Sequence, residues 1–411
     1  MAASATTAPN VAALRAGFET DLFLIDPDIT VSYARDRTGA YFGLPLAVAR
    51  PRSTAELSAV MVRCAEIGVG VVPQGGLTGL VGAAVSNADD TEVVVLLDRM
   101  SAVRSIDTVG LAMVVEAGCV LETAKQAAEA QDCLLPITFG SQGSCRVGGN
   151  VSTNAGGFNV LRYGMTRDLV LGLEVVLPDG RIWNGLRTLR KDNRGYDLKQ
   201  LFIGAEGTLG IVTAAALKLF PKPTQVETAM VGLRSVEDAM AFYARARRSC
   251  SDLLSAFEII LRPGLELALS AHPELSDPLE SPCPVYILME LAAVGRVDLR
   301  ALLEACLAGN CCSTGRSQPA ALRRTACGSA ARRWSKRRAV GAPTIGPTCL
   351  CRSTRSRLFW RKRWLVLLFR CRSAGRLLMV MSATAIFISM SCRRPTGQWT
   401  SAKRCSERRS S

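Results

Sequence analysis

The chain has 411 residues, 48% of them hydrophobic, and a formal net charge of +15 at pH 7. This charge is confined to one end: residues 306–411 carry 23 Lys or Arg and a single acid, Glu407, whereas residues 1–305 carry 27 basic and 34 acidic residues. The composition therefore excludes a uniformly basic protein, and residues 1–305 form a mildly acidic chain long enough for two domains.

The first residues of the chain and the distribution of its cysteines indicate the cellular compartment of the protein. Residues 1–10 are small and polar, without the basic start and apolar run of a secretory signal. The cysteines up to Cys283 are scattered, without paired metal-ligand spacing, which favours buried thiols in a reducing environment. We therefore expect a cytoplasmic protein.

Residues 1–45 form an N-terminal segment, and residues 46–223 form the first predicted domain. An N-cap signal, Ser53 with Glu56 three positions later, marks the start of one of its helices. The elements expected up to residue 223 are, in order, a helix at Val11–Phe18, a strand at Ala47–Arg50, a helix to about Glu66, strands at Val69–Val72, Val93–Leu97 and Met113–Glu116, a helix at Leu121–Ala130, a hairpin of Leu173–Leu177 with Ile182–Trp183, and a strand at Ile211–Leu219.

Residues 224–309 continue with alternating elements. The pattern predicts strands at Met230–Leu233 and Val285–Met289, and helices at Ser235–Arg247, Gly264–Leu269 and Val297–Ala308. Short strands and helices mixed around Gly-rich turns predict an α+β fold, not a doubly wound parallel sheet. We expect two subdomains within residues 46–223, followed by an incomplete α+β domain at 224–309.

Three glycine-rich segments interrupt this pattern: Pro73–Gly82, Pro136–Gly157 and Phe202–Val212. Glycines remove the Cβ atoms that hold a ligand away from the main chain, and small hydroxyl and amide side chains supply hydrogen-bonding groups. Successive backbone amides after a strand can bind a pyrophosphate. The first segment is not a Walker loop and does not fit the Rossmann spacing. A flexible linker is the alternative, but Val147 and Val151 within the second segment argue against it.

In their order and spacing, these segments resemble the FAD-binding domain of the p-cresol methylhydroxylase/vanillyl-alcohol oxidase (PCMH) type. The runs Leu161–Gly180 and Lys191–Leu198 resemble most the branch with D-2-hydroxyglutarate dehydrogenase, D-lactate dehydrogenase and the glycolate oxidase D-subunit. The resemblance covers roughly residues 20–300. It implies non-covalent FAD, because the Pro73 loop has no His or Cys for a covalent link. The family usually has Asn where this chain has Leu77, which removes a side-chain hydrogen-bonding group.

The resemblance also implies which residues contact FAD. At the pyrophosphate these are Pro73, Gln74, Gly75, Gly76, Leu77, Thr78, Gly79 and Gly82. Along the ribityl chain and ring they are Pro136, Ser141, Gly143, Ser144, Gly148, Gly149, Asn150, Thr153, Asn154, Gly156 and Gly157. At the adenine side or the ring edge they are Glu206, Gly207, Gly210, Ile211 and Val212, with a turn cap as the alternative role for Glu206. Arg162, Tyr163 and Arg167 either face the substrate or brace the domain.

Residues 310–411 fit no domain pattern. Their apolar run Leu377–Met390 is too short, and too closely flanked by arginine, for a membrane span. Met379–Ser391 permits codons that, read from the third base of the first, spell Gly-His-Val-Gly-Asp-Gly-Asn-Ile-His-Phe-Asn-Val. This is the signature of the family's cap domain. We interpret residues 310–411 as an out-of-frame, disordered tail. A basic arm that binds nucleic acid is the alternative.

The resemblance implies an FAD-dependent oxidoreductase that converts a D-2-hydroxy acid of the D-2-hydroxyglutarate, D-lactate or glycolate class to the 2-oxo acid. Its partners would be that small acid and an unidentified electron acceptor, without nucleic acid or a membrane span, with a homodimer as one option. The divalent metal of the family would lack its ligands here, so the chain as written is expected to be inactive. We assign no catalytic residue and no metal ligand. Oxidation of another alcohol or phenol, or nucleic-acid binding through the tail, are the alternatives.

Overall fold

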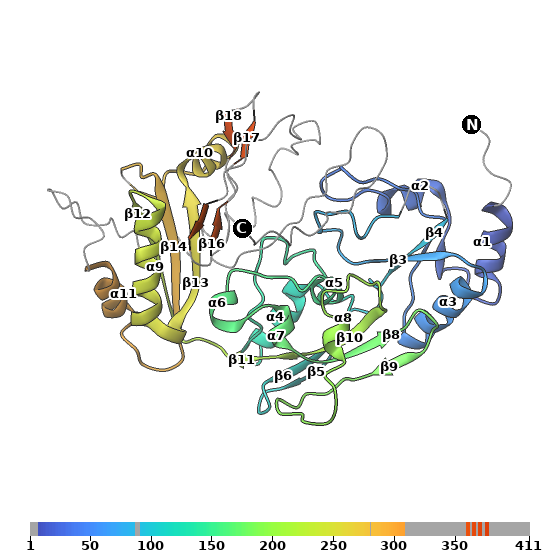
Figure 1. The fold of residues 1–411 in the computed structure, drawn as a ribbon. Helices are drawn as coiled ribbons and strands as arrows, with labels where there is room; N and C mark the ends of the chain where they lie inside the picture. Colours follow the sequence, from blue (N-terminus) through green and yellow to red (C-terminus); the bar gives the residue numbers. More distant parts are fainter. Residues whose placement is uncertain are drawn as a thin grey trace, which may run out of the picture.

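The computed structural model describes residues 7–86, 91–279 and 281–308, and four short strands between residues 359 and 377 (Figure 1). Within residues 7–308 a mixed sheet, an antiparallel sheet and a second antiparallel sheet follow one another along the chain. Helices and sheets alternate irregularly, which confirms the α+β class predicted from the sequence.

The first sheet has the strand order β1-β2-β4-β3. Its first strand pairs antiparallel with the second, and the other neighbours are parallel. The helix that joins β2 to β3 begins where predicted, because the Ser53 hydroxyl accepts a hydrogen bond from the Glu56 amide at 3.1 Å. The elements of this part are α1 (Thr7–Arg15), β1 (Phe23–Leu24), α2 (Pro27–Thr30), the 3₁₀ turn η1 (Val31–Tyr33), β2 (Ala47–Ala49), α3 (Thr54–Glu66), β3 (Gly70–Gln74) and β4 (Glu92–Leu96).

The second sheet is antiparallel, with the order β5-β6-β10-β8-β9. Its central strand β10 is buried from Ile211 to Leu217, as an apolar run without alternation requires. The elements are β5 (Val103–Asp107), β6 (Ala112–Glu116), α4 (Leu121–Glu129), β7 (Cys133–Leu134), α5 (Val147–Ser152), α6 (Val160–Tyr163), α7 (Thr166–Leu169), β8 (Val170–Val176), β9 (Ile182–Asn184), α8 (Lys199–Phe202), β10 (Ile211–Lys218) and β11 (Phe220–Pro221), which pairs with β7.

One hydrophobic cluster packs the first two sheets together. It contains Val93 and Val95 from the first sheet, Val115 and Val175 from the second, and Leu57 from α3, each fully buried. Burial at about 25 cal/mol per Å² of apolar surface makes such a shared cluster the main stabilising contribution of this part. The two sheets therefore form one packed body, which fixes the loops that connect them.

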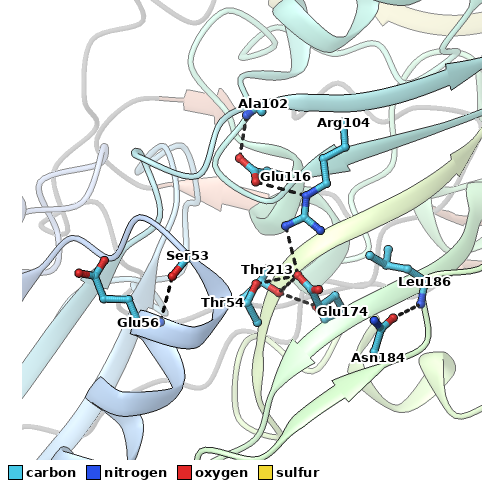
Figure 2. A network of polar contacts seen from close by, with 10 residues as sticks. All are labelled: Ser53, Thr54, Glu56, Ala102, Arg104, Glu116, Glu174, Asn184, Leu186 and Thr213. Carbon is cyan, nitrogen blue, oxygen red and sulfur yellow. Dashed lines mark hydrogen bonds and ion pairs between the residues drawn. The ribbon is translucent and has the colours of Figure 1, made fainter.

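A polar network connects α3 with the second sheet (Figure 2). Glu174 on β8 accepts hydrogen bonds from the hydroxyls of Thr54 at 2.7 Å and Thr213 at 2.8 Å, and from Arg104 at 3.3 Å. Arg104 also pairs with Glu116 at 3.2 Å. Burial raises the pKa of Glu174, but the hydrogen bonds from Thr54 and Thr213 and the charge of Arg104 together outweigh it, so that the pKa lies below its ordinary value. The carboxylate thus stays charged where α3 meets the second sheet.

The third sheet has the order β12-β14-β13 and its own core. Its edge strand β13 was not predicted, because its nearly continuous apolar run lacks strand alternation. The elements are β12 (Gln225–Leu233), α9 (Val236–Cys250), the 3₁₀ turn η2 (Ser251–Leu253), β13 (Leu254–Leu261), α10 (Arg262–Ala271), β14 (Val285–Ala293) and α11 (Leu299–Ala308). The domain limits at residues 45, 223 and 309 stay predictions.

In the tail, the structure describes two antiparallel pairs: β15 (Phe359–Arg361) with β16 (Trp364–Val366), and β17 (Phe369–Cys371) with β18 (Gly375–Leu377). The other residues of the predicted out-of-frame tail, 310–411, lie outside the described residues, and its disorder stays a prediction. Within the part of the chain that is described, no helix is both long and apolar enough to cross a membrane.

Candidate functional site

The loop that follows β3 is fixed at its base by Gln74. Its amide nitrogen donates to the carbonyl oxygens of Tyr33 at 3.0 Å and Ala84 at 2.8 Å, and the side chain is only 3% exposed. At the far end of the loop, Gly82 has a φ of +77° and lies against Tyr41, where a Cβ would stand 2.5 Å from the ring. The backbone between these points is therefore held in place at the carboxyl end of a parallel strand.

Two glycines allow the second segment to pack closely against its neighbours, which are the first segment and the turn after β6. A Cβ on Gly76 would overlap the carbonyl of Ser144, and a Cβ on Gly148 would stand 2.6 Å from the Cβ of Ala117. The Gly148 amide also donates to the Ala117 carbonyl at 2.8 Å. At these two positions glycine is required by contacts within the protein.

Gly149, the next residue of α5, has the opposite environment. A Cβ built on it would meet no atom within 4 Å, so this face of the helix borders open space. Gly75 of the first loop faces it, since a Cβ on Gly75 would stand 3.7 Å from the Gly149 Cα. Gly79 likewise borders open space. Bare backbone beside the first loop is thus available to a ligand at Gly149.

The third segment joins the other two at the end of α5. The amides of Gly204 and Glu206 donate to the carbonyls of Val151 at 3.1 Å and Ser152 at 2.9 Å. Glu206 has a φ of +52°, and a Cβ on Gly207 would overlap the ring of Pro73. All three glycine-rich segments therefore meet around one short helix, although residues 83–201 lie between the first segment and the third.

Arg167 and Arg162 brace this arrangement. The Arg167 amide donates to the Asn154 side-chain oxygen at 2.9 Å, and its guanidinium donates to the carbonyls of Gln200, at 3.0 Å, and Ile203. The Arg162 guanidinium donates to the Ala292 carbonyl of β14 at 2.6 Å. Of the two roles that the sequence left open for these arginines, their contacts favour the bracing one.

Several predicted cofactor residues also have packing or turn contacts inside the protein. Asn150, Ile211 and Val212 are buried, and the Cβ positions of Gly157 and Gly210 are closed by backbone carbonyls. Three residues take part in hydrogen bonds: the Thr153 hydroxyl donates to the Gly149 carbonyl at 2.8 Å, the Ser144 hydroxyl donates to the Ser141 carbonyl at 3.4 Å, and the Pro136 carbonyl accepts from Asn159 at 3.1 Å. Gly143 lies near Glu122, and Gly156 lies near Met165. Thr78 is half-buried in its loop. Their cofactor contacts stay predictions.

Arg146 was not selected from the sequence, although it is the N-cap residue of α5. Its guanidinium donates to the Gly118 carbonyl at 2.5 Å, which ties α5 to the turn after β6. Its Nε and the Oε1 of Gln74 are buried without a hydrogen-bond partner among the described residues. A lone arginine between Cys145 and Val147 in a segment of small residues was the available signal.

A metal centre is not evident in this part of the chain. Among the residues that the structure describes, no group of three or more His, Cys, Asp or Glu side chains is placed to hold a metal ion. The metal expected for the family has therefore no support here.

Comparison with known proteins agrees with this geometry. Residues 45–185 match the family model described as an FAD binding domain. The chain is 42% identical over 269 residues to the mitochondrial D-2-hydroxyglutarate dehydrogenase of Danio rerio, covering 66% of this chain and 50% of that protein. It is 44% identical over 246 residues to the Bos taurus enzyme of the same name, covering 60% and 44% respectively. The chain thus spans about half the length of the curated relatives it matches.

Solved structures show the same fold at low identity. Alkyldihydroxyacetonephosphate synthase superposes with a TM-score of 0.61 at 18% identity, covering 73% of this chain and 58% of that one. For p-cresol methylhydroxylase with substrate bound, the TM-score is 0.56 at 18% identity, covering 73% and 62%. These likenesses establish the PCMH-type fold and nothing finer.

The expected cytoplasmic location is wrong by these comparisons, because the Danio rerio and Bos taurus relatives are named as mitochondrial enzymes. The inference failed for a physical reason. It rested on the lack of a secretory signal, whereas mitochondrial transit peptides are amphipathic and rich in Arg and Ser, and have no comparable apolar run.

Proposed function

We propose that this chain, whose residues 45–185 match an FAD binding domain, is the cofactor-binding part of an FAD-dependent dehydrogenase for D-2-hydroxy acids. The observation that supports it most is the convergence of three glycine-rich segments around α5, with Gly149 facing open space. The family model and the relatives support the cofactor and the substrate class.

The residues present fit FAD. Bare backbone at Gly79 and Gly149 leaves room that a Cβ would fill, and the hydrogen bonds of Gln74 fix the first loop before any ligand arrives. FAD, when bound, supplies the hydride acceptor for oxidation of an alcohol. The loop after β3 and α5 would hold it through backbone groups. Arg167 keeps the third segment against α5 and so maintains the shape of the site.

The substrate class is supported by the named relatives, which are D-2-hydroxyglutarate dehydrogenases at 42% and 44% identity. Among the described residues no group of His, Cys, Asp or Glu is placed to hold a metal ion, so we place the groups that activate the substrate in the other half of a full-length protein. We propose that residues 310–411 replace this half by translation in the wrong frame, and that the chain as written binds FAD without catalysing turnover.

The test begins with FAD binding by the chain as written. Reconstituted protein, after removal of free cofactor, is expected to keep a flavin absorption spectrum that dithionite bleaches, since chemical reduction needs no substrate pocket. Absence of retained flavin would contradict the cofactor proposal.

The frame-restored protein is then assayed by dye reduction with D-2-hydroxyglutarate, D-lactate and glycolate. Flavin reduction only by another alcohol or phenol would refute the substrate class and leave the FAD site in place.

A further inference from the structure

Two cysteines in the core of the third sheet lie in contact. The sulfur atoms of Cys250, at the end of α9, and Cys306, in α11, are 3.3 Å apart. Their residues are 1% and 0% exposed, and both belong to the core between these helices and the third sheet. All seven cysteines of residues 7–86, 91–279 and 281–308 are free thiols, so the pair is reduced.

We propose that Cys250 and Cys306 form a reversible disulfide that locks α11 onto α9. The residues are 56 positions apart, so the bond would close a long loop containing β13, α10 and β14. A cross-link over a loop of this length restricts the unfolded chain strongly. Besides the two cysteines, α11 is held by Leu299 and Leu303 in the same core. Oxidation would therefore stabilise the last described helix of the domain.

The reaction needs a two-electron oxidant, for which hydrogen peroxide is sufficient. The thiolate of one cysteine attacks the peroxide oxygen, giving a sulfenic acid and hydroxide, and the second thiolate then displaces hydroxide from that sulfur. In sum two thiols and one peroxide give one disulfide and two water molecules. A dithiol such as dithiothreitol reverses the bond by thiol–disulfide exchange.

Burial of the two thiols controls when the disulfide can form. Burial, together with the hydrogen bond to Cys306, raises the pKa of Cys250 to about 12, so Cys250 holds almost no thiolate at neutral pH while the two sulfurs are packed together. Peroxide also has no path to two sulfurs without exposed surface. Oxidation therefore requires α11 to open first, and the rate should stop rising with peroxide concentration once opening limits it.

The test is made on the full chain by differential alkylation and tandem mass spectrometry. After peroxide treatment the protein is unfolded in guanidinium chloride, free thiols are labelled with one isotope of N-ethylmaleimide, and after reduction the rest are labelled with another. We expect Cys250 and Cys306 to be protected together, at equal occupancy, and hydrogen exchange of the α11 amides to slow by about tenfold or more. Dithiothreitol should restore both values.

Cys250→Ala should leave Cys306 open to alkylation after the same treatment, and Cys306→Ala should do so for Cys250. The control is Cys283→Ala, which removes a half-buried thiol of the same domain and should leave the pairing unchanged. Should either buried variant fail to fold, the isotope ratios of the unmodified chain still decide. Pairing of Cys306 with Cys311 or Cys312, or oxidation of Cys250 and Cys306 at unequal occupancy, would overturn the proposal.

Discussion

At the scale of single residues, adjacent glycines in α5 have opposite roles. Gly148 packs against Ala117, whereas Gly149 faces open space. Gly149→Val should therefore leave the fold intact while its branched side chain enters the cofactor space. Overpacking of this kind costs about 1–3 kcal/mol, so we expect FAD binding at least about fivefold weaker by fluorescence titration.

Two matched variants make that measurement specific. Gly149→Ala adds one methyl group and should weaken FAD binding less, and Ala130→Val, at the exposed end of α4, should not weaken it at all. Circular dichroism checks that each protein is folded. Unchanged FAD affinity in folded Gly149→Val would show that the cofactor does not occupy the space beside α5. Gly156→Val is a less specific probe, because a Cβ there already stands 3.2 Å from the Met165 methyl group.

Leu77 is strained, so replacing the family's Asn by Leu costs backbone energy in addition to the loss of a hydrogen-bonding side chain. Its φ of +49° lies in the left-handed region, which costs a non-glycine residue about 1–2 kcal/mol and which Asn adopts more readily than Leu. Leu77→Asn should therefore raise the free energy of unfolding by about 1 kcal/mol in a urea titration. Leu80→Asn, on the same loop without a positive φ, is the control and should give no such gain.

At the scale of elements, Glu174 connects α3 with β8 and β10. Glu174→Gln should lower the free energy of unfolding by about 1–3 kcal/mol at neutral pH, because the amide cannot replace a carboxylate that accepts from Thr54, Thr213 and Arg104. Glu129→Gln, which alters an exposed ion pair with Lys222, should cost less.

The same carboxylate gives a pH dependence with a defined sign. The pKa of Glu174 in the folded protein lies below its ordinary value of 4.5, so its contribution is complete above pH 4.5 and is lost as the pH falls through the lower, folded value. The difference in stability between the unmodified protein and Glu174→Gln should accordingly shrink below pH 4.5. A difference that grows in acid would mean that the folded protein holds a protonated Glu174.

Much of the architecture was predictable because it follows from local patterns. The N-cap at Ser53, the hairpin of β8 with β9 and the three glycine-rich segments are all visible in the sequence. Helix α5 was not predicted, since Gly, Asn and Ser are weak helix formers and contacts with Ala117 and Cys119 hold it in place. Without that helix, the sequence cannot tell which of two adjacent glycines faces the ligand.

At the scale of the whole molecule, the proposed change of reading frame predicts a loss of activity. The chain as written should reduce no dye with D-2-hydroxy acids, whereas the frame-restored protein should be active, because orientation and activation of the substrate are lost together. Loss of several kcal/mol of transition-state stabilisation corresponds to more than about a hundredfold in rate. Equal turnover by the two proteins in a side-by-side assay, with zinc or manganese present or absent, would contradict the assignment of the tail.

The short helix α6 has a practical consequence for dividing this protein into fragments. Leu161 packs against the core of the third sheet, and Arg162 donates to the Ala292 carbonyl of β14, although both precede the predicted boundary at residue 223 by some sixty positions. Separate expression of residues 224–308 would leave an apolar site without Leu161 and a carbonyl without its donor. Such a fragment would be prone to self-association, and limited proteolysis is better directed to bonds that leave α6 attached to both parts.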